Sequence, residues 1–316
     1  MTWNRPSLRL ALAILSITVL TACSGSPGGT ETATETAAPV SSVRLSYAGC
    51  GITKKAFMEE LAKAFKAKTG IEIDIAGGGA TKGITNASTG TADLGGGCRH
   101  KVPGPEEANA RQVHVAWDAL VAIVHPENPV DNLSSDQLRG ILTGEIRTWS
   151  AVGGDSAVLI TVAARSGKIS GVGRIARELI FRDPAADYVA NAITYPSSGP
   201  LEQAIEESRT MIGVTGVSSA RKRGVKILSI DGIEPSYENI ASGTYPYVRP
   251  LFIYIGSSPS KETQAFIDFA RSPEGQAVIR SQGSVTLEDG KALAGSYAQK
   301  MLALNLPQEL WQLTEG

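Results

Sequence analysis

Short strands alternate with helices along most of this chain, and this alternation constrains the fold more than any other feature. Apolar patterns predict a strand over 43–47, a helix over 56–68, a second strand over 71–75 and a second helix over 82–88. Regular alternation of strand and helix is typical of a parallel sheet with helices on its faces. We therefore expect an α/β fold from residue 43 onward.

The remaining segments predict a second lobe and a return to the first. A buried strand over 117–124 runs into 125–129, where two prolines interrupt regular structure and indicate a crossing between lobes. Further strands are predicted over 159–163, 211–217 and 251–255, and helices over 134–142, 173–181, 261–271, 273–282 and 292–304. We expect a two-lobed α/β fold in which each lobe is a mainly parallel sheet flanked by helices, with a ligand cleft between the lobes.

The chain before residue 43 is predicted to serve export and tethering. Basic residues precede an apolar stretch over 10–20 that is too short to span a bilayer, as in a signal peptide over 1–22. Cys23 follows Leu-Thr-Ala, which resembles a bacterial lipoprotein signal, so we expect it to carry a lipid anchor. In the alternative, a plain signal peptide, Cys23 is a stray thiol. The segment 23–41 is rich in Ser, Thr, Gly, Ala and Pro and predicts a flexible tether.

These boundaries assign 42–126 plus 246–316 to lobe 1 and 127–245 to lobe 2. The hinge is expected near 125–129 and near the return strand at 249–254.

Charge and residue counts narrow the range of possible functions. The 316 residues include 30 Lys and Arg against 31 Asp and Glu, a formal net charge of -1, so no basic field suits a nucleic acid. Only three histidines occur, and none belongs to a nucleophile or zinc motif. We therefore expect neither an enzyme nor a resident metal or cofactor.

Several motifs, in order along the chain, carry a family resemblance that covers about 43–287. They are Asp118–Val124, Asn128–Val130, Asn132–Ser134, Gln137–Leu138, Thr143–Ile146, Trp149, Val152–Gly154, Leu228–Gly232, Glu234–Pro235, Ser242–Pro246 and Ser272–Gln276. Together they resemble the phosphate-binding proteins of ABC importers. The resemblance implies a monomer that captures phosphate or a related small oxyanion and delivers it to ABC permease subunits. It also implies an exported, lipid-anchored protein at the membrane that faces the periplasm or cell exterior.

The first two ligand loops implied by this resemblance precede the first two helices. Such proteins hold an oxyanion with backbone N–H groups at helix N-termini, with hydroxyls and often with one Arg. In the first loop, Thr53 either caps the helix or presents its hydroxyl to the ligand. In the second, Ala80 stands where relatives usually have a serine, so Thr81 or backbone amides would take over that role.

The third and fourth loops supply the remaining candidates. Cys98 occupies the position of a serine or aspartate in relatives, and Arg99 either holds the anion or pairs with a carboxylate on the rim. In the fourth loop Arg165 is the expected bidentate clamp, and Ser170 and Gly171 are expected donors. These departures, with Val172 in place of a threonine, predict weaker phosphate binding or a different small ligand.

Cys50 and Cys98 lie on the first and third loops, and we expect a disulfide between them. The alternative is a thiol pair that, with His100, binds a soft metal or metalloid. This alternative would suit an extracytoplasmic sensor or binding lipoprotein for a different ligand, a function that needs the same closing lobes.

Overall fold

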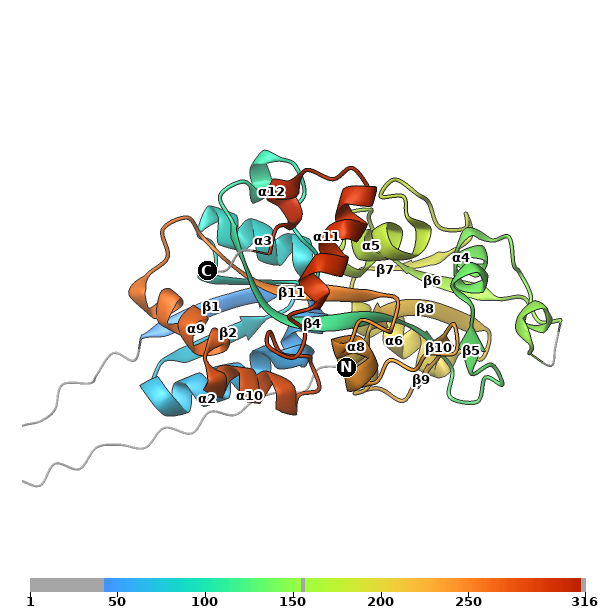
Figure 1. Ribbon diagram of the computed structural model, residues 1–316, viewed down its shortest axis with the longest axis horizontal. Coiled ribbons are helices and arrows are strands. Elements are labelled where there is room, and N and C mark those ends of the chain that lie inside the picture. The colour runs from blue at the N-terminus through green and yellow to red at the C-terminus, as the bar shows by residue number, and fades with distance from the viewer. Residues whose placement is uncertain (1–42, 155–156, 314–316) are drawn as a thin grey trace, which may run out of the picture. The chain divides into compact units, whose positions relative to one another are not determined.

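The computed structural model describes residues 43–154 and 157–313, and a nine-stranded sheet runs through this part of the chain (Figure 1). The strand order is β2-β1-β3-β11-β4-β8-β6-β7, with β9 paired to β4. These strands are β1 (Arg44–Gly49), β2 (Glu72–Ala76), β3 (Leu94–Gly97), β4 (Arg111–Val124), β6 (Thr161–Arg165), β7 (Ile193–Tyr195), β8 (Met211–Gly216), β9 (Lys226–Ile227) and β11 (Val248–Ile255). A separate pair consists of β5 (Asn132–Leu133) and β10 (Ser229–Ile230).

The long strands β4 and β11 join two parallel α/β halves. β4 pairs antiparallel with β11 through residues 111–119 and with β8 through residues 120–124. On one side β1 pairs parallel with β2 and β3, and on the other β6 pairs parallel with β7 and β8. We call the side with β1, β2, β3 and β11 the first half and the side with β6, β7, β8 and β9 the second half. The α/β architecture and the return of β11 to the first half confirm the predicted fold, while lobe boundaries at 126/127 and 245/246 stay a prediction.

Helices flank both halves, as the coloured ribbon shows (Figure 1). Those of the first half and the C-terminal region are α1 (Gly51–Thr53), η1 (Lys54–Met58), α2 (Glu59–Thr69), α3 (Gly79–Thr89), η2 (Pro105–Glu107), α9 (Lys261–Arg271), α10 (Pro273–Ser281), α11 (Leu293–Ala303) and α12 (Gln308–Trp311). Those that follow β5 are α4 (Ser135–Thr143), η3 (Trp149–Val152), α5 (Gly171–Ala176), η4 (Arg177–Phe181), α6 (Ser198–Glu207), α7 (Val217–Ala220) and α8 (Tyr237–Ala241). The sequence patterns had not indicated β7, α6, α7 or α8.

Serine caps explain where several predicted helices begin. The Ser134 side chain accepts from the Gln137 backbone N–H, and the Gln137 side chain accepts from the Ser134 N–H, which completes a capping box at α4. Ser260 and Ser272 cap α9 and α10 in the same way, through Thr263 N and Gly275 N. Each cap satisfies an amide that the first helical turn would otherwise leave without a partner.

Two segments expected to be loops are regular structure. The expected turn over 49–53 is already helical from Gly51, because the Cys50 sulfur accepts from Thr53 N and caps the first turn. The expected third loop contains β3, whose glycines allow close packing. A Cβ placed on Gly96 would lie 1.7 Å from Tyr47 Oη, so only glycine fits there.

The predicted signal peptide, tether and lipidated Cys23 lie outside the described residues. Among the helices described, none is long and apolar enough to cross a membrane.

Candidate functional site

The beginnings of three helices meet where the two halves touch. α1 and α3 belong to the first half and α5 to the second, and α3 contacts α5. A Cβ placed on Gly171, the first residue of α5, would lie 2.5 Å from Cys98 Sγ and 2.9 Å from Ala80 Cβ. A side chain at Gly171 would therefore hold the halves apart, and the predicted second, third and fourth loops do come together.

Arg165 is a buried charged group at this junction, and no described residue pairs with it. It ends β6 and is only 8% exposed, yet its side chain makes no hydrogen bond or ion pair to any residue the structure describes, and Nε is a buried donor without an acceptor. A Cβ placed on Gly79, the first residue of α3, would lie 4.0 Å from Arg165 Nη2, so the guanidinium points toward the other half. Burial lowers the pKa of Arg165, because the charged form loses solvation.

A buried unpaired guanidinium costs free energy unless an anion neutralises it. Backbone N–H groups at the starts of α3 and α5 favour negative charge at the same point. The arrangement can therefore hold a small anion between the halves.

Cys50 and Cys98 face each other at the base of the junction. Both are buried and both are free thiols in the structure, so the predicted disulfide stays a prediction. Burial raises the pKa of Cys50, but hydrogen bonds from Cys98 and Thr53 and the charge of Arg249 outweigh it and lower the pKa to about 6. The hydrogen bond to Cys50, together with burial, raises the pKa of Cys98 well above its usual value. Of the two thiols, Cys50 is therefore the one that loses its proton more readily.

Thr53, in the first loop, is fully buried. Its hydroxyl lies 2.7 Å from Tyr47 Oη and donates to Cys50 O at 3.1 Å. The side chain that caps α1 is that of Cys50, so the proposed capping role of Thr53 is wrong. Thr53 instead makes hydrogen bonds that hold Cys50 in place.

A buried ion pair that the sequence reading missed lies next to the thiols. Arg249 of β11 donates to Asp118 of β4 at 2.8 Å, and both side chains are fully buried. Asp118 Oδ1 also accepts from the Ser218 N–H at 3.2 Å, at the start of α7. A signal was available, because Asp118 interrupts the apolar run of the predicted strand over 117–124.

Arg99 pairs with a carboxylate, as in the second of its two predicted alternatives, but the partner Glu107 is buried and does not lie on the rim. Nη1 donates to Glu107 Oε2 at 2.9 Å and to His100 O at 2.8 Å. Nε donates to Ile169 O of the second half at 2.8 Å, and the Thr81 hydroxyl donates to the same oxygen at 3.2 Å. Arg99 and Thr81 are thus engaged in contacts between the halves.

Ser170 and Gly171 stand at the start of α5, which begins two residues before the predicted helix over 173–181. The Ser170 hydroxyl donates to Gly167 O at 3.1 Å, while its oxygen keeps lone pairs free to accept. Gly171 begins the helix beside Cys98, with its backbone N–H in the unpaired first turn.

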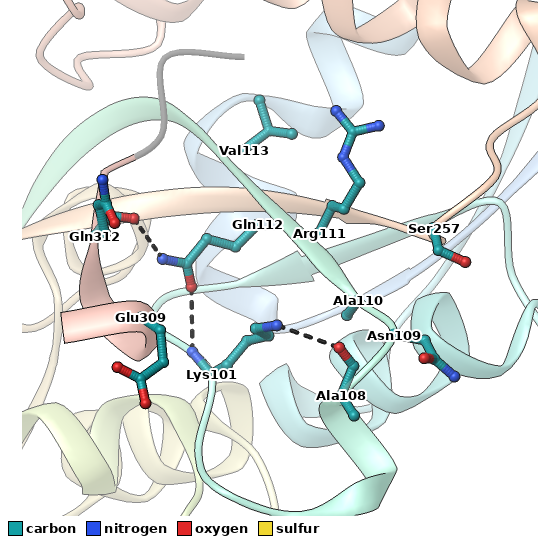
Figure 2. Close-up of a pocket in the computed structure, with 10 residues that line it drawn as sticks. All are labelled: Lys101, Ala108, Asn109, Ala110, Arg111, Gln112, Val113, Ser257, Glu309 and Gln312. Atoms are coloured by element: carbon teal, nitrogen blue, oxygen red, sulfur yellow. Dashed lines mark hydrogen bonds between the residues drawn. The ribbon is translucent and has the colours of Figure 1, made fainter. Parts of the chain in front are cut away.

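Two cavities lie near these elements. One of about 510 Å³ is lined by Arg165, Lys168, Arg177 and Tyr188, and Lys168 pairs with Asp187 at its edge. Another, of about 540 Å³, lies beside β4 and α12 and holds none of the predicted ligand residues. Figure 2 shows Gln112 at its centre, donating to Gln312 O and accepting from Lys101 N. In the described ranges, no three His, Cys, Asp or Glu side chains are grouped to hold a metal ion.

Comparison with known proteins agrees with this arrangement. The PBP superfamily domain matches residues 36–274. The phosphate-binding protein PstS of Borreliella burgdorferi is 31% identical over 184 residues, which is 56% of this chain and 66% of that protein. PstS of Bacillus subtilis is 26% identical over 238 residues, 74% of this chain and 75% of that protein. The chain thus spans two thirds to three quarters of the length of these relatives.

Solved structures give the same result. A Clostridium perfringens protein named as a phosphate ABC transporter substrate-binding protein, with bound phosphate, is 27% identical and matches with a TM-score of 0.70 over 77% of this chain and 99% of that chain. An ABC-type phosphate transport receptor of Vibrio cholerae is 25% identical, with a TM-score of 0.59 and the same coverage. Because the domain match spans most of the sequence, this chain belongs to the PBP superfamily.

Proposed function

We propose that this protein binds phosphate or a related small oxyanion between its two halves and delivers it to the permease of an ABC importer. The observation that carries the proposal is Arg165, a buried guanidinium at the junction of α3 and α5 that has no partner among the described residues. An oxyanion there would accept bidentate hydrogen bonds from Arg165 and backbone hydrogen bonds from both helix starts. The names of the relatives, phosphate-binding proteins and transport receptors, support the same ligand.

The thiols make this site differ from one built of hydroxyls and carboxylates. A neutral Cys98 offers one weak donor, and a Cys50 thiolate adds negative charge near the anion. We therefore expect weaker phosphate binding at high pH, where the thiolate and a doubly charged phosphate repel each other. The alternatives of a sensor and of a thiol-bound metal or metalloid find no support in these relatives.

The remaining parts of the proposal concern location and assembly. We propose an exported monomer, anchored at the membrane through lipid on Cys23 and facing the periplasm or cell exterior, with no catalytic activity. The N-terminal sequence supports the anchor. Mass spectrometry of the protein purified from membranes would detect the lipid on an N-terminal cysteine, and an unmodified N-terminus would contradict it.

Calorimetric titration tests the ligand. The domain from Ser42 onward would be titrated with phosphate, arsenate and sulfate, each with and without reductant. Saturable binding of phosphate or arsenate at one site per chain is the expected result. Absence of binding to all three anions under both conditions would refute the proposal.

A further inference from the structure

Beside the anion junction, a buried histidine of one half contacts a buried carboxylate of the other. His100 follows β3 in the first half, and Glu178 lies in η4 of the second half. His100 Nε2 is 3.1 Å from both Glu178 oxygens, and both side chains are fully buried. This contact joins residues that are 78 positions apart in the sequence.

Both ring nitrogens of His100 face hydrogen-bond acceptors. Nδ1 lies 2.6 Å from Lys101 O, a carbonyl that can only accept, and Nε2 faces a carboxylate. Both ring nitrogens can donate to these two acceptors at once only when the ring is an imidazolium that carries both protons. A neutral ring would lose one of the two hydrogen bonds.

Glu178 is held as a carboxylate. Burial raises its pKa, but the charges and hydrogen bonds of His100 and Arg174 outweigh this effect and lower it. Arg174, one helical turn earlier, donates through Nε to Glu178 Oε1. The charge of Glu178, after burial itself, also raises the pKa of Tyr297 of α11, which places that phenol close by.

The other charged groups around His100 are already paired. Arg99 is bound to Glu107, and Arg99 Nε reaches across to Ile169 O. Among the described residues around the ring, Glu178 is therefore the one carboxylate that faces the imidazole directly. Arg174 is the second cation that pairs with Glu178.

We propose that His100, Glu178 and Arg174 form a charged latch between the halves, which favours the closed arrangement and strengthens anion binding when His100 is protonated. The inference rests on the proposed function, since it concerns the same binding event. A protein that must close to bind has an apparent affinity reduced by the fraction of time it is open. Contacts made only when the halves meet therefore raise affinity without touching the ligand. The residues of the latch are positioning residues.

The test uses two variants and one matched control in the domain from Ser42 onward. Glu178→Gln keeps the size of the side chain and removes its charge. His100→Gln keeps an N–H where Nε2 donates and cannot titrate. The control is Asp93→Asn, because Asp93 accepts from Ser46 N and Ser46 Oγ, both in the first half. This control changes a carboxylate whose hydrogen bonds stay within the first half.

Phosphate affinity would be measured from pH 5.5 to 8.5 for all four proteins. Loss of a charge-assisted hydrogen bond predicts about 10- to 100-fold weaker binding by Glu178→Gln at low pH. We expect the ratio of wild-type affinity to that of His100→Gln to fall as pH rises, and Asp93→Asn to bind like wild type. A wild-type Kd in Glu178→Gln, or a ratio for His100→Gln that is independent of pH, would overturn the latch.

Small-angle scattering separates failure of the latch from failure of the proposed function. Without added ligand, Glu178→Gln should have a larger radius of gyration than wild type and than Asp93→Asn. An unchanged radius in a folded Glu178→Gln would refute the latch. If wild type binds none of the three anions while Glu178→Gln still expands, the anion proposal fails and the latch stands.

Discussion

Replacement of Arg165 by methionine should separate stability from binding. Methionine has a similar length and no charge, so it removes the guanidinium while it fills the same space. Because Arg165 makes no hydrogen bond or ion pair to a described residue, the ligand-free protein loses no favourable contact. The methionine variant is also relieved of the desolvation cost of a buried cation, which favours its folded state.

The expected magnitudes follow from this difference. Removal of one partner of a buried charged pair typically costs about 3–5 kcal/mol, so anion affinity should fall by about 10²- to 10³-fold or more. The ligand-free variant should be as stable as wild type or more stable by about 1 kcal/mol, a rise in Tm of about 2 °C. Calorimetric titration with phosphate and thermal unfolding without phosphate measure the two effects.

Arg249 provides the matched control, since it is equally buried but paired. Arg249→Met leaves the Asp118 carboxylate buried without its cation, so the free energy of unfolding should fall by about 3–5 kcal/mol. Undiminished phosphate affinity in Arg165→Met would remove Arg165 from the site. A loss of stability in Arg165→Met as large as that in Arg249→Met would show that the Arg165 guanidinium has a favourable partner in the ligand-free protein.

Other predictions concern the thiols, the junction and one cap. In the oxidised domain from Ser42 onward, a disulfide between Cys50 and Cys98 should stabilise by about 3–4 kcal/mol in the chain-entropy model, and a count of two free thiols in an unreduced, denatured sample would contradict it. In the reduced protein the pKa of Cys50 is lowered to about 6. The contribution of the Cys50 thiolate to the free energy of unfolding is therefore complete above the pKa of an unfolded cysteine and is lost as pH falls through about 6. Thermal unfolding of the wild type should show this trend, and Cys50→Ser should lack it. Gly171→Ala should weaken phosphate binding with little change in Tm, because its Cβ would meet the Cys98 sulfur across the junction, whereas equal affinity would mean that the halves need not approach so closely. Ser134→Ala should lower the free energy of unfolding by about 1 kcal/mol through loss of the cap, measured by urea denaturation, and no loss would contradict the role of the capping box.

Several elements of the site could be read from local sequence. Glycine-rich turns before helices indicated where backbone amides would be available, and Arg165, predicted in the loop after the strand over 159–163, lies at the end of β6. The short elements β7, α7 and α8 gave no clear periodicity, because segments of a few residues carry too little pattern to separate strand from helix. β3 was hidden for another reason. Its glycines lower strand propensity, and the close approach of Tyr47 that requires them is visible only in the folded protein.

The sequence by itself determined the α/β class and the order of most elements, because periodicity, caps and glycines act over a few residues. Only the tertiary structure decided which charges are paired. Arg99 and Arg249 found Glu107 and Asp118, Arg165 found no described partner, and His100 met Glu178 from the other half. These pairings join residues that are 8, 131 and 78 positions apart. Burial and distance in space set the strength of a charge interaction, and neither can be read from spacing along the chain.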